Sequence, residues 1–185
     1  MKTWLVRGTW LALAVTAGLT TWLLLANRAP SVRPSSAAAG RQPDYRLSDA
    51  DITRYASDGR RQSVLHAASV EHMPVSGDSR LTAIELHYYP RAQAWRLRAA
   101  HGVLSNDGDR LALTGSVRAR EVDVPDPVHF AAPHVVVFLS THQIRSDARV
   151  TLWRGAQVTT GVGLLADLHA GTVSLLRNVT SRYVQ

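Results

Sequence analysis

Eight histidines in this sequence could perform metal or acid–base chemistry, and the chain has no cysteine. Without cysteine there is no disulfide, no thiolate metal ligand and no cysteine nucleophile. No two histidines have the His-Glu-x-x-His spacing that places a pair of metal ligands on one face of a helix. We therefore predict no metal site and interpret the histidines as surface or edge residues. They are His66, His72, His87, His101, His129, His134, His142 and His169.

Asp107 and Asp109 flank Gly108 and could be a pair of catalytic carboxylates. Such a pair needs a cleft that shifts the pKa values, whereas this local sequence is typical of a polar hairpin turn. The sequence contains no G-x-S-x-G, no phosphate-binding P-loop and no G-x-G-x-x-G. We therefore predict no catalytic residues, no cofactor and no nucleotide site, and an envelope enzyme with an unfamiliar active site stays only as an alternative.

Arginines at alternate positions are the remaining polar feature. Arg96 and Arg98 would share one face of a strand, and so would Arg118 and Arg120. The simpler interpretation is a solvated outer face. The alternative is contact with lipid phosphates at the mouth of a cavity, because a guanidinium group binds phosphate through two hydrogen bonds.

The formal net charge of +7 is unevenly distributed along the chain. Residues 1–41 carry five basic and no acidic side chains, whereas residues 42–185 carry 16 arginines and 14 acidic residues, a net charge of only +2. A nucleic-acid-binding domain is basic over its folded surface, so we predict no nucleic-acid partner. The basic N-terminal segment suits an anionic membrane surface instead.

Near its N-terminus the chain contains nineteen consecutive uncharged residues, 8–26. As a helix they would span about 28 Å, close to the ~30 Å hydrocarbon core of a bilayer. The run is longer than that of a cleavable signal peptide, and the first A-x-A candidate after it, 37–39, lies well beyond its end. The numbers of basic residues on the two sides of this segment are nearly equal, so charge does not decide its orientation. We predict that the larger, C-terminal part is exported, because a short cytoplasmic tail is the simpler topology. We predict a cytoplasmic tail at 1–7, an uncleaved transmembrane helix at 8–26, a flexible linker at 27–43 and a periplasmic domain at 44–185.

Beyond Tyr45 the apolar residues recur with a period near two, and no segment long enough for a helix shows a period of 3.6. Many short strands joined by tight turns predict an all-β sandwich, jelly roll or barrel. Residues 135–139 are apolar on both faces, which indicates a strand covered on both sides or facing an apolar cavity. Residues 178–185 form a strand-like end that a partner strand could extend. Turn signals stand at 58–59, 76–78, 106–108, 125–127 and 170–171.

Taken in order, these features resemble the LptC family, the single-pass inner-membrane component of lipopolysaccharide export. The resemblance covers essentially the whole chain, including the N-terminal anchor and its linker. No single piece is diagnostic, but the ordered set in a chain of this size is fairly specific. The segments that carry it are 58–67, 95–107, 111–117, 150–152, 160–161 and 179–183.

This resemblance implies an open, twisted β-jellyroll of the OstA-like type behind one transmembrane helix, located in the inner membrane with its C-terminal domain in the periplasm. It implies that lipopolysaccharide acyl chains bind between two sheets, that the N-terminal edge docks on LptF and that the C-terminal edge docks on LptA. The anchor would lie against the permease formed by LptF and LptG. By resemblance, Gly161 matches a functionally important glycine, Tyr183 lies on the LptA-facing edge and Leu81 lies near a lipid-contacting position.

An apolar groove would suit this task, because each exposed CH₂ of an acyl chain costs about 0.8 kcal/mol in water. An ordinary core would use the same side chains, so both interpretations stay open. For Gly161 the alternative is a turn or bulge glycine with positive φ, and for Tyr183 it is a residue that caps the core. There are two alternative functions for the whole protein. It could be an adaptor that binds only proteins, or a soluble LptA-like carrier with a cleaved signal. The predicted groove residues are Leu81, Trp95, Leu97, Leu111, Leu113, Val137, Leu139, Leu152 and Leu175.

The first testable prediction concerns the N-terminal segment. If residues 8–26 are an uncleaved anchor, the mature protein isolated from membranes retains this segment, because no cleavage site closely follows its apolar run. Intact-mass spectrometry of the mature protein measures this. A mass that corresponds to a chain beginning near residue 40 would instead support the soluble carrier.

Overall fold

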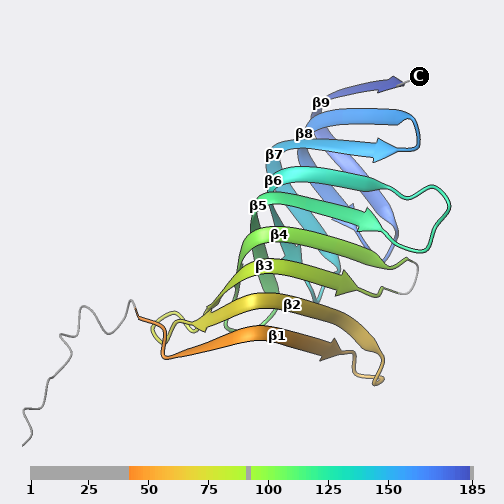
Figure 1. Cartoon of the computed structure of the whole chain (residues 1–185). Helices are drawn as coiled ribbons and strands as arrows, with labels where there is room; N and C mark the ends of the chain where they lie inside the picture. Colours follow the sequence, from red (N-terminus) through yellow and green to blue (C-terminus); the bar gives the residue numbers. More distant parts are fainter. Residues whose placement is uncertain (1–41, 91–92, 184–185) are drawn as a thin grey trace, which may run out of the picture. The chain divides into compact units, whose positions relative to one another are not determined.

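The computed structural model describes residues 42–90 and 93–183, which form nine β-strands (Figure 1). These residues belong to one unit, which begins at Gly40. The predicted tail, the predicted transmembrane helix and all but the last two residues of the linker lie outside the described residues. Within the described part of the chain, no helix is long and apolar enough to cross a membrane. The strands are β1 (Tyr45–Tyr55), β2 (Arg61–His72), β3 (Ser79–Tyr88), β4 (Trp95–Leu104), β5 (Arg110–Glu121), β6 (His129–Phe138), β7 (Gln143–Arg154), β8 (Gln157–Asp167) and β9 (Thr172–Tyr183).

Each strand pairs antiparallel with its neighbours in the sequence, so the sheet order is β1 to β9 without a crossover. The prediction of an all-β protein is therefore confirmed for the described residues. The two sheets that the resemblance implies are two halves of one continuous, twisted sheet. β1 and β9 are its edges, and neither edge pairs with another described strand.

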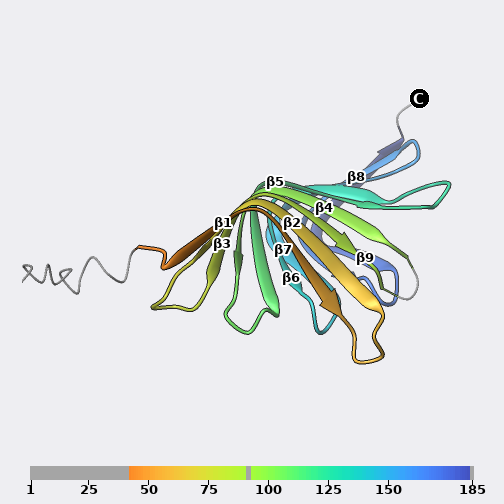
Figure 2. The same cartoon turned by 60° about the horizontal axis from the view of Figure 1, so that its bottom comes forward.

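A line of backbone irregularities, called here the fold line, crosses the middle of the strands. Along it the pairing register shifts by one residue at 115–116 of β5, at 147–148 of β7 and at 178–179 of β9. Gly115 and Gly163 lie on this line with φ of +83° each. An extra residue in one strand bends it and increases its twist. Figure 2 shows that the strands bend along this line, so the sheet folds over onto itself.

The inward alternation is interrupted where the strands cross the fold line. In β4 the buried positions on either side are Ala99 and Gly102, three residues apart instead of two. In the bulged strand β5 they are Leu113 and Val117, four residues apart. Each strand therefore contributes two short alternating segments to the same interior, one from each half of the sheet. This explains why the sequence indicates short strands where the structure has strands of 10 to 12 residues.

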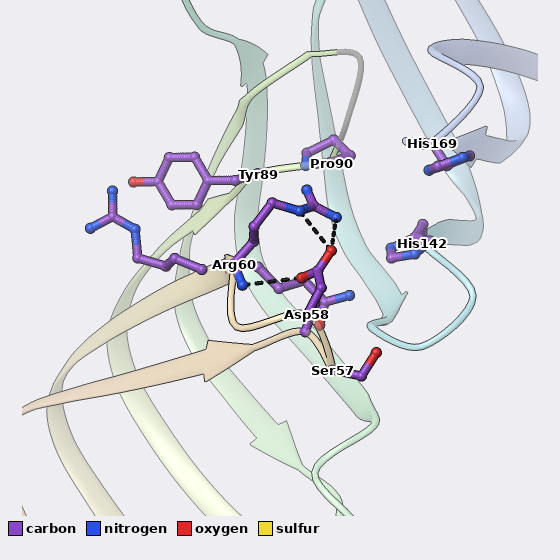
Figure 3. Close-up of a pocket in the computed structure, with 10 residues that line it drawn as sticks. Ser57, Asp58, Arg60, Tyr89, Pro90, His142 and His169 are labelled. Atoms are coloured by element: carbon purple, nitrogen blue, oxygen red, sulfur yellow. Dashed lines mark hydrogen bonds and ion pairs between the residues drawn. The ribbon is translucent and has the colours of Figure 1, made fainter.

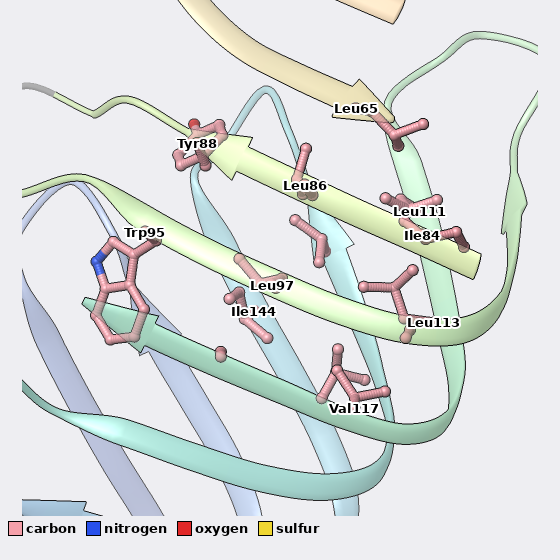
Figure 4. Packing of buried hydrophobic residues seen from close by; sticks show 14 of the residues in the cluster. Leu65, Ile84, Leu86, Tyr88, Trp95, Leu97, Leu111, Leu113, Val117 and Ile144 are labelled. Atoms are coloured by element: carbon pink, nitrogen blue, oxygen red, sulfur yellow. The ribbon is translucent and has the colours of Figure 1, made fainter. Parts of the chain in front are cut away.

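The interior between the two halves holds a continuous apolar cluster. It includes side chains from β2 to β8, and its largest members, among them Trp95, Tyr88 and Phe130, are less than 2% exposed. Figure 4 shows Leu86, Leu97 and other members pointing into the space between the layers of strands. Burial of each such side chain contributes about 1.5–3 kcal/mol, so the folded sheet is stabilised by its own two halves.

Burial declines toward both edges of the sheet. In β1 the large apolar side chains Leu47 and Ile52 are 48% and 36% exposed, although they lie opposite the buried residues of β2 in the register. In β9 no residue is fully buried. The interior therefore reaches both edges and is left uncovered there by the described residues.

The fold line generates the second prediction. A Cβ at Gly115 would lie 2.7 Å from the Cβ of Ala100, at a φ of +83°. Strain at positive φ costs about 1–2 kcal/mol and the overlap adds about 1–3 kcal/mol. We expect Gly115→Ala to lower the free energy of unfolding in urea by about 2–5 kcal/mol.

Gly108→Ala is the matched control, because Gly108 also has positive φ, +70°, but no atom within 4 Å of the added Cβ. We expect Gly108→Ala to lower the free energy of unfolding by about 1–2 kcal/mol, the cost of backbone strain alone. Equal losses in the two variants would show that close packing across the fold line is unimportant.

Candidate functional site

All nine predicted groove residues point into the one interior. Seven of them, Leu81, Trp95, Leu97, Leu111, Leu113, Val137 and Leu139, are at most 5% exposed, and Leu152 and Leu175 are partly buried against the cluster. The fold line accounts for this, because it brings alternating segments of different strands to face one another. The side chains form one apolar surface within the sheet, and their role as a lipid groove stays a prediction.

Trp95 is the largest side chain in this interior. Its ring lies tilted against Phe130, with 6.2 Å between the ring centroids. Its Nε1 is buried and finds no hydrogen-bond partner among the described residues. A buried donor without a partner destabilises a fold by about 1–3 kcal/mol. The interior therefore contains one polar atom that an acceptor on a bound molecule could satisfy.

The two halves of the sheet meet again on the side away from the fold line, along what we call the seam. Here the guanidinium of Arg54, at the end of β1, donates a hydrogen bond of 2.9 Å to the carbonyl oxygen of Gly108 in the β4–β5 turn. Further along, the Tyr88 hydroxyl, at the end of β3, lies 3.4 Å from the Leu139 carbonyl and also contacts His142 Nδ1. These polar contacts join turns of one half to strand ends of the other.

A hollow of about 390 Å³ opens at the seam beside these contacts. The β1–β2 turn, in which Arg60 forms an ion pair of 2.8 Å with Asp58, faces the turns that carry His142 and His169 (Figure 3). The two histidine rings stack with 5.5 Å between centroids. Burial lowers the pKa of His142, the neighbouring His169 lowers it further, and Asp167 partly opposes both effects.

The chemistry of the seam does not resemble a catalytic site. Burial raises the pKa of Tyr88 above its ordinary value of 10, so its hydroxyl stays protonated and is a poor nucleophile.

The carboxylate of Asp107 accepts hydrogen bonds from the Ser105 hydroxyl and the Asp109 backbone N–H. These bonds lower the pKa of Asp107, and the interpretation of 107 and 109 as hairpin-turn residues is confirmed.

Four histidines outside the apolar interior, His66, His72, His87 and His134, are each paired with an acid. His66 contacts Asp51, and His134 contacts Asp147. The hydrogen bond that the His66 ring donates to the Asp51 carboxylate raises the pKa of His66, against an opposing effect of desolvation. In the described parts of the chain, no group of three potential ligands could hold a metal ion.

Gly161 lies in β8, opposite Val150, beside the register shift of β9. Its φ is not in the positive region, so the alternative interpretation as a positive-φ glycine is wrong; Gly163, two residues on, has that conformation. Space explains Gly161 better, because a Cβ there would lie 3.0 Å from the Cβ of Leu175. The structure thus makes Gly161 the position where β9 packs closely on β8.

Tyr183 is the last described residue of β9 and is 77% exposed. The alternative that it caps the core is therefore wrong. It pairs with Gln157 on β8 and leaves its other side toward the free edge. Its role at a partner interface stays a prediction.

Sequence reasoning missed the seam residues Arg54, Tyr88 and His142. Tyr88 continues the alternation of Ile84 and Leu86, so its burial could have been inferred from periodicity. The partners of Arg54 and Tyr88 could not, because each lies 51 or more residues away along the chain. Their meeting depends on the bend of the whole sheet.

These features define an open, antiparallel β protein whose own two halves enclose an apolar interior that reaches two unpaired edges. A family model described as "Lipopolysaccharide-assembly, LptC-related" matches residues 10–184. The chain therefore belongs to the LptC-related family, a family of non-enzymatic lipopolysaccharide-transport proteins, as the resemblance predicts.

The solved structures support the fold. The chain is similar to LptH from Pseudomonas aeruginosa, described as the LptA-homologous periplasmic component of the lipopolysaccharide transport device, with a TM-score of 0.54 and 11% sequence identity. The match covers 66% of this chain and 95% of that one. Among the curated proteins no match is found. At this level of identity the likeness concerns the fold, an open twisted sheet of the same kind.

The third prediction follows from His142. Because its folded pKa is lowered, the neutral form stabilises the seam above the ordinary value of 6.5, and this contribution is lost as the pH falls through the folded pKa. Histidine NMR titration should show His142 titrating below 6.5 and His66 above it. His169→Gln should move the pKa of His142 upward, since it removes a neighbouring positive charge. A pKa of His142 above 6.5 would contradict this account of the seam.

Proposed function

We propose that this protein holds lipopolysaccharide by its acyl chains in the apolar interior and passes it from the inner-membrane transporter to the periplasmic bridge. The observation that carries the proposal is a continuous apolar interior that extends to both unpaired edges of the sheet. Residues 8–26 anchor the protein in the inner membrane, and the β domain lies in the periplasm. The interior offers acyl chains an environment in which each CH₂ avoids about 0.8 kcal/mol of exposure to water.

Entry of an acyl chain requires the two halves of the sheet to separate. The central groove residues, such as Leu97 and Leu113, are completely buried as the sheet stands. Separation would bend the sheet at the fold line, where Gly115 and Gly163 allow a wide range of backbone conformations. It would break the polar contacts of the seam, and an acceptor on the lipid would satisfy the indole N–H of Trp95.

The two edges suit neighbours of the same architecture. At β1, Leu47 and Ile52 face the interior side, and at β9 so do Val173 and Leu175, which pack beside buried residues of β8. A partner strand added to either edge would satisfy the free backbone groups and extend the apolar surface. We propose LptF at the β1 edge and LptA at the β9 edge.

Within the β9 edge, Tyr183 would lie in the contact with LptA, and Gly161 would keep β9 closely packed for that contact. No nucleotide motif occurs in the sequence. The free energy for directional movement would therefore come from ATP hydrolysis in a partner complex that includes LptF and LptG. Passage between neighbours needs similar affinities in successive interiors, because a deep trap would stall the flow.

The fourth prediction tests the interior in living cells. A photo-crosslinking amino acid at Leu97 or Leu139, both buried in the interior, should form adducts with lipopolysaccharide that depend on cellular ATP. Val103 is the control, since it lies on the same strand as Leu97 but is exposed on the outer face. Immunoblots for lipopolysaccharide detect the adducts.

Adducts at the two interior positions but not at Val103 would support the proposed function. If the folded, membrane-bound protein gave no adduct at any of these positions, the interior would be an ordinary core. The chain would then be an adaptor that binds only proteins through its edges.

A further inference from the structure

Four arginines gather on the outer face of the sheet, on two neighbouring strands. We call Arg96 and Arg98 of β4 with Arg118 and Arg120 of β5 the arginine patch. In the register Arg96 lies directly opposite Arg120, and Arg98 lies directly opposite Arg118. Neighbouring strands are about 4.8 Å apart and alternate residues about 7 Å apart. The four side chains therefore start from a compact rectangle, with a pair of arginines at each short side.

This arrangement is unfavourable in the protein by itself. Like charges directly opposite each other on adjacent strands destabilise a sheet. Glu85 of β3 offsets part of the repulsion, with contacts of 3.3 Å to Arg96 and 3.0 Å to Arg98. Arg118 and Arg120 form no ion pair with any residue in the described ranges. Two of the four guanidinium groups therefore lack a counter-charge.

The patch also accounts for the charge of the whole domain. Its four arginines and Glu85 give a net charge of +3. Residues 42–185 carry 16 arginines and 14 acidic residues, so the remainder, with 12 arginines and 13 acids, has a net charge of −1. The excess positive charge of the domain is thus concentrated at one place, where it can attract an anion.

A hollow of about 750 Å³ lies over the patch. Its other side is formed by β6 and β7, where the rings of His129 and Trp153 stack with 5.2 Å between centroids, and by Pro127 before β6. His129 lies opposite both Arg120 and Trp153 in the register. The volume is in the range of small-molecule sites, roughly 300–1,000 Å³. The hollow combines a cationic floor with an aromatic wall.

We propose that the arginine patch binds the phosphate groups of anionic phospholipid headgroups, so that this outer face can rest on a membrane surface. A pair of facing guanidinium groups suits one tetrahedral phosphate, because each can donate two hydrogen bonds to its oxygens. Trp153 at the rim suits the interface between headgroups and acyl chains, where tryptophan is favoured. The expected membrane segment at 8–26 would keep the domain close to such a surface.

The proposal concerns the outer face and does not depend on lipid in the interior. An acidic protein loop is a weaker candidate, because carboxylates would not need the aromatic wall beside the patch. Free phosphate would leave that wall unused as well. The test therefore separates these three sources of negative charge.

The test uses the full chain in a neutral detergent and isothermal titration calorimetry. The probes are dihexanoyl phosphatidylglycerol, dihexanoyl phosphatidylcholine, inorganic pyrophosphate and a glutamate-rich peptide. We expect phosphatidylglycerol to bind most tightly. We expect its affinity to fall as salt is added. Arg118→Gln with Arg120→Gln should weaken this binding by about 30-fold, since each arginine near an anionic lipid surface contributes about fivefold in affinity.

Arg110→Gln with Arg149→Gln is the matched control. It removes the same charge from two exposed arginines, one of them also on β5, that do not line the hollow. It should leave the affinity within about twofold of the original protein. The thermal midpoint of the patch variant should not fall, because the substitution removes repulsion between facing arginines.

Four results would overturn the proposal. Equal affinity for phosphatidylcholine and phosphatidylglycerol would show that the acyl chains alone are recognised. Equal losses in the two double variants would show that only net charge matters. Pyrophosphate binding as tightly as the lipid would assign the patch to free phosphate, and the peptide binding as tightly would assign it to a protein partner.

Discussion

A sheet with one apolar face must cover that face, and the described part of this chain contains no helix or second sheet to do so. The nine strands meet this requirement by bending together, so that one half of the sheet covers the other. The bend needs an irregular residue in the middle of the strands, supplied by bulges in β5, β7 and β9 and by glycines such as Gly115. Interior, seam and open edges all follow from this one bend.

Alternation along each strand separates the chemistry of the two faces of the sheet. Inward positions such as Leu97 are apolar and buried, while the adjacent outward positions Arg96 and Arg98 are charged. A strand that carries an apolar molecule on one side and binds anions on the other needs only this alternation. Because the sheet is continuous, its two edges are equivalent in kind, and a neighbour of the same fold could prolong either one. The likeness to LptH in fold extends over nearly the whole of that protein.

Much of the fold could be predicted from local sequence. The Asp58-Gly59 and Asn106-Asp107-Gly108 turns lie between strands as predicted, because their backbone preferences are local. The turn at 139–142 was missed, since it contains neither glycine nor proline. Alternation placed the groove residues on one face, yet predicted short strands, because the fold line interrupts the pattern in the middle of strands such as β4 and β5.

By itself, the sequence determined the all-β class, the inward face, several turns and the resemblance to the LptC family, since periodicity, turn residues and order along the chain are properties of near neighbours. Only the tertiary structure decided that two halves of one sheet enclose the interior and that Arg54 and Tyr88 close a seam. It also decided that Arg96 faces Arg120, and that Gly161 is needed for space and not for positive φ. The physical reason is that register and bend arise from pairing along the whole sheet, where a one-residue bulge changes which distant side chains meet.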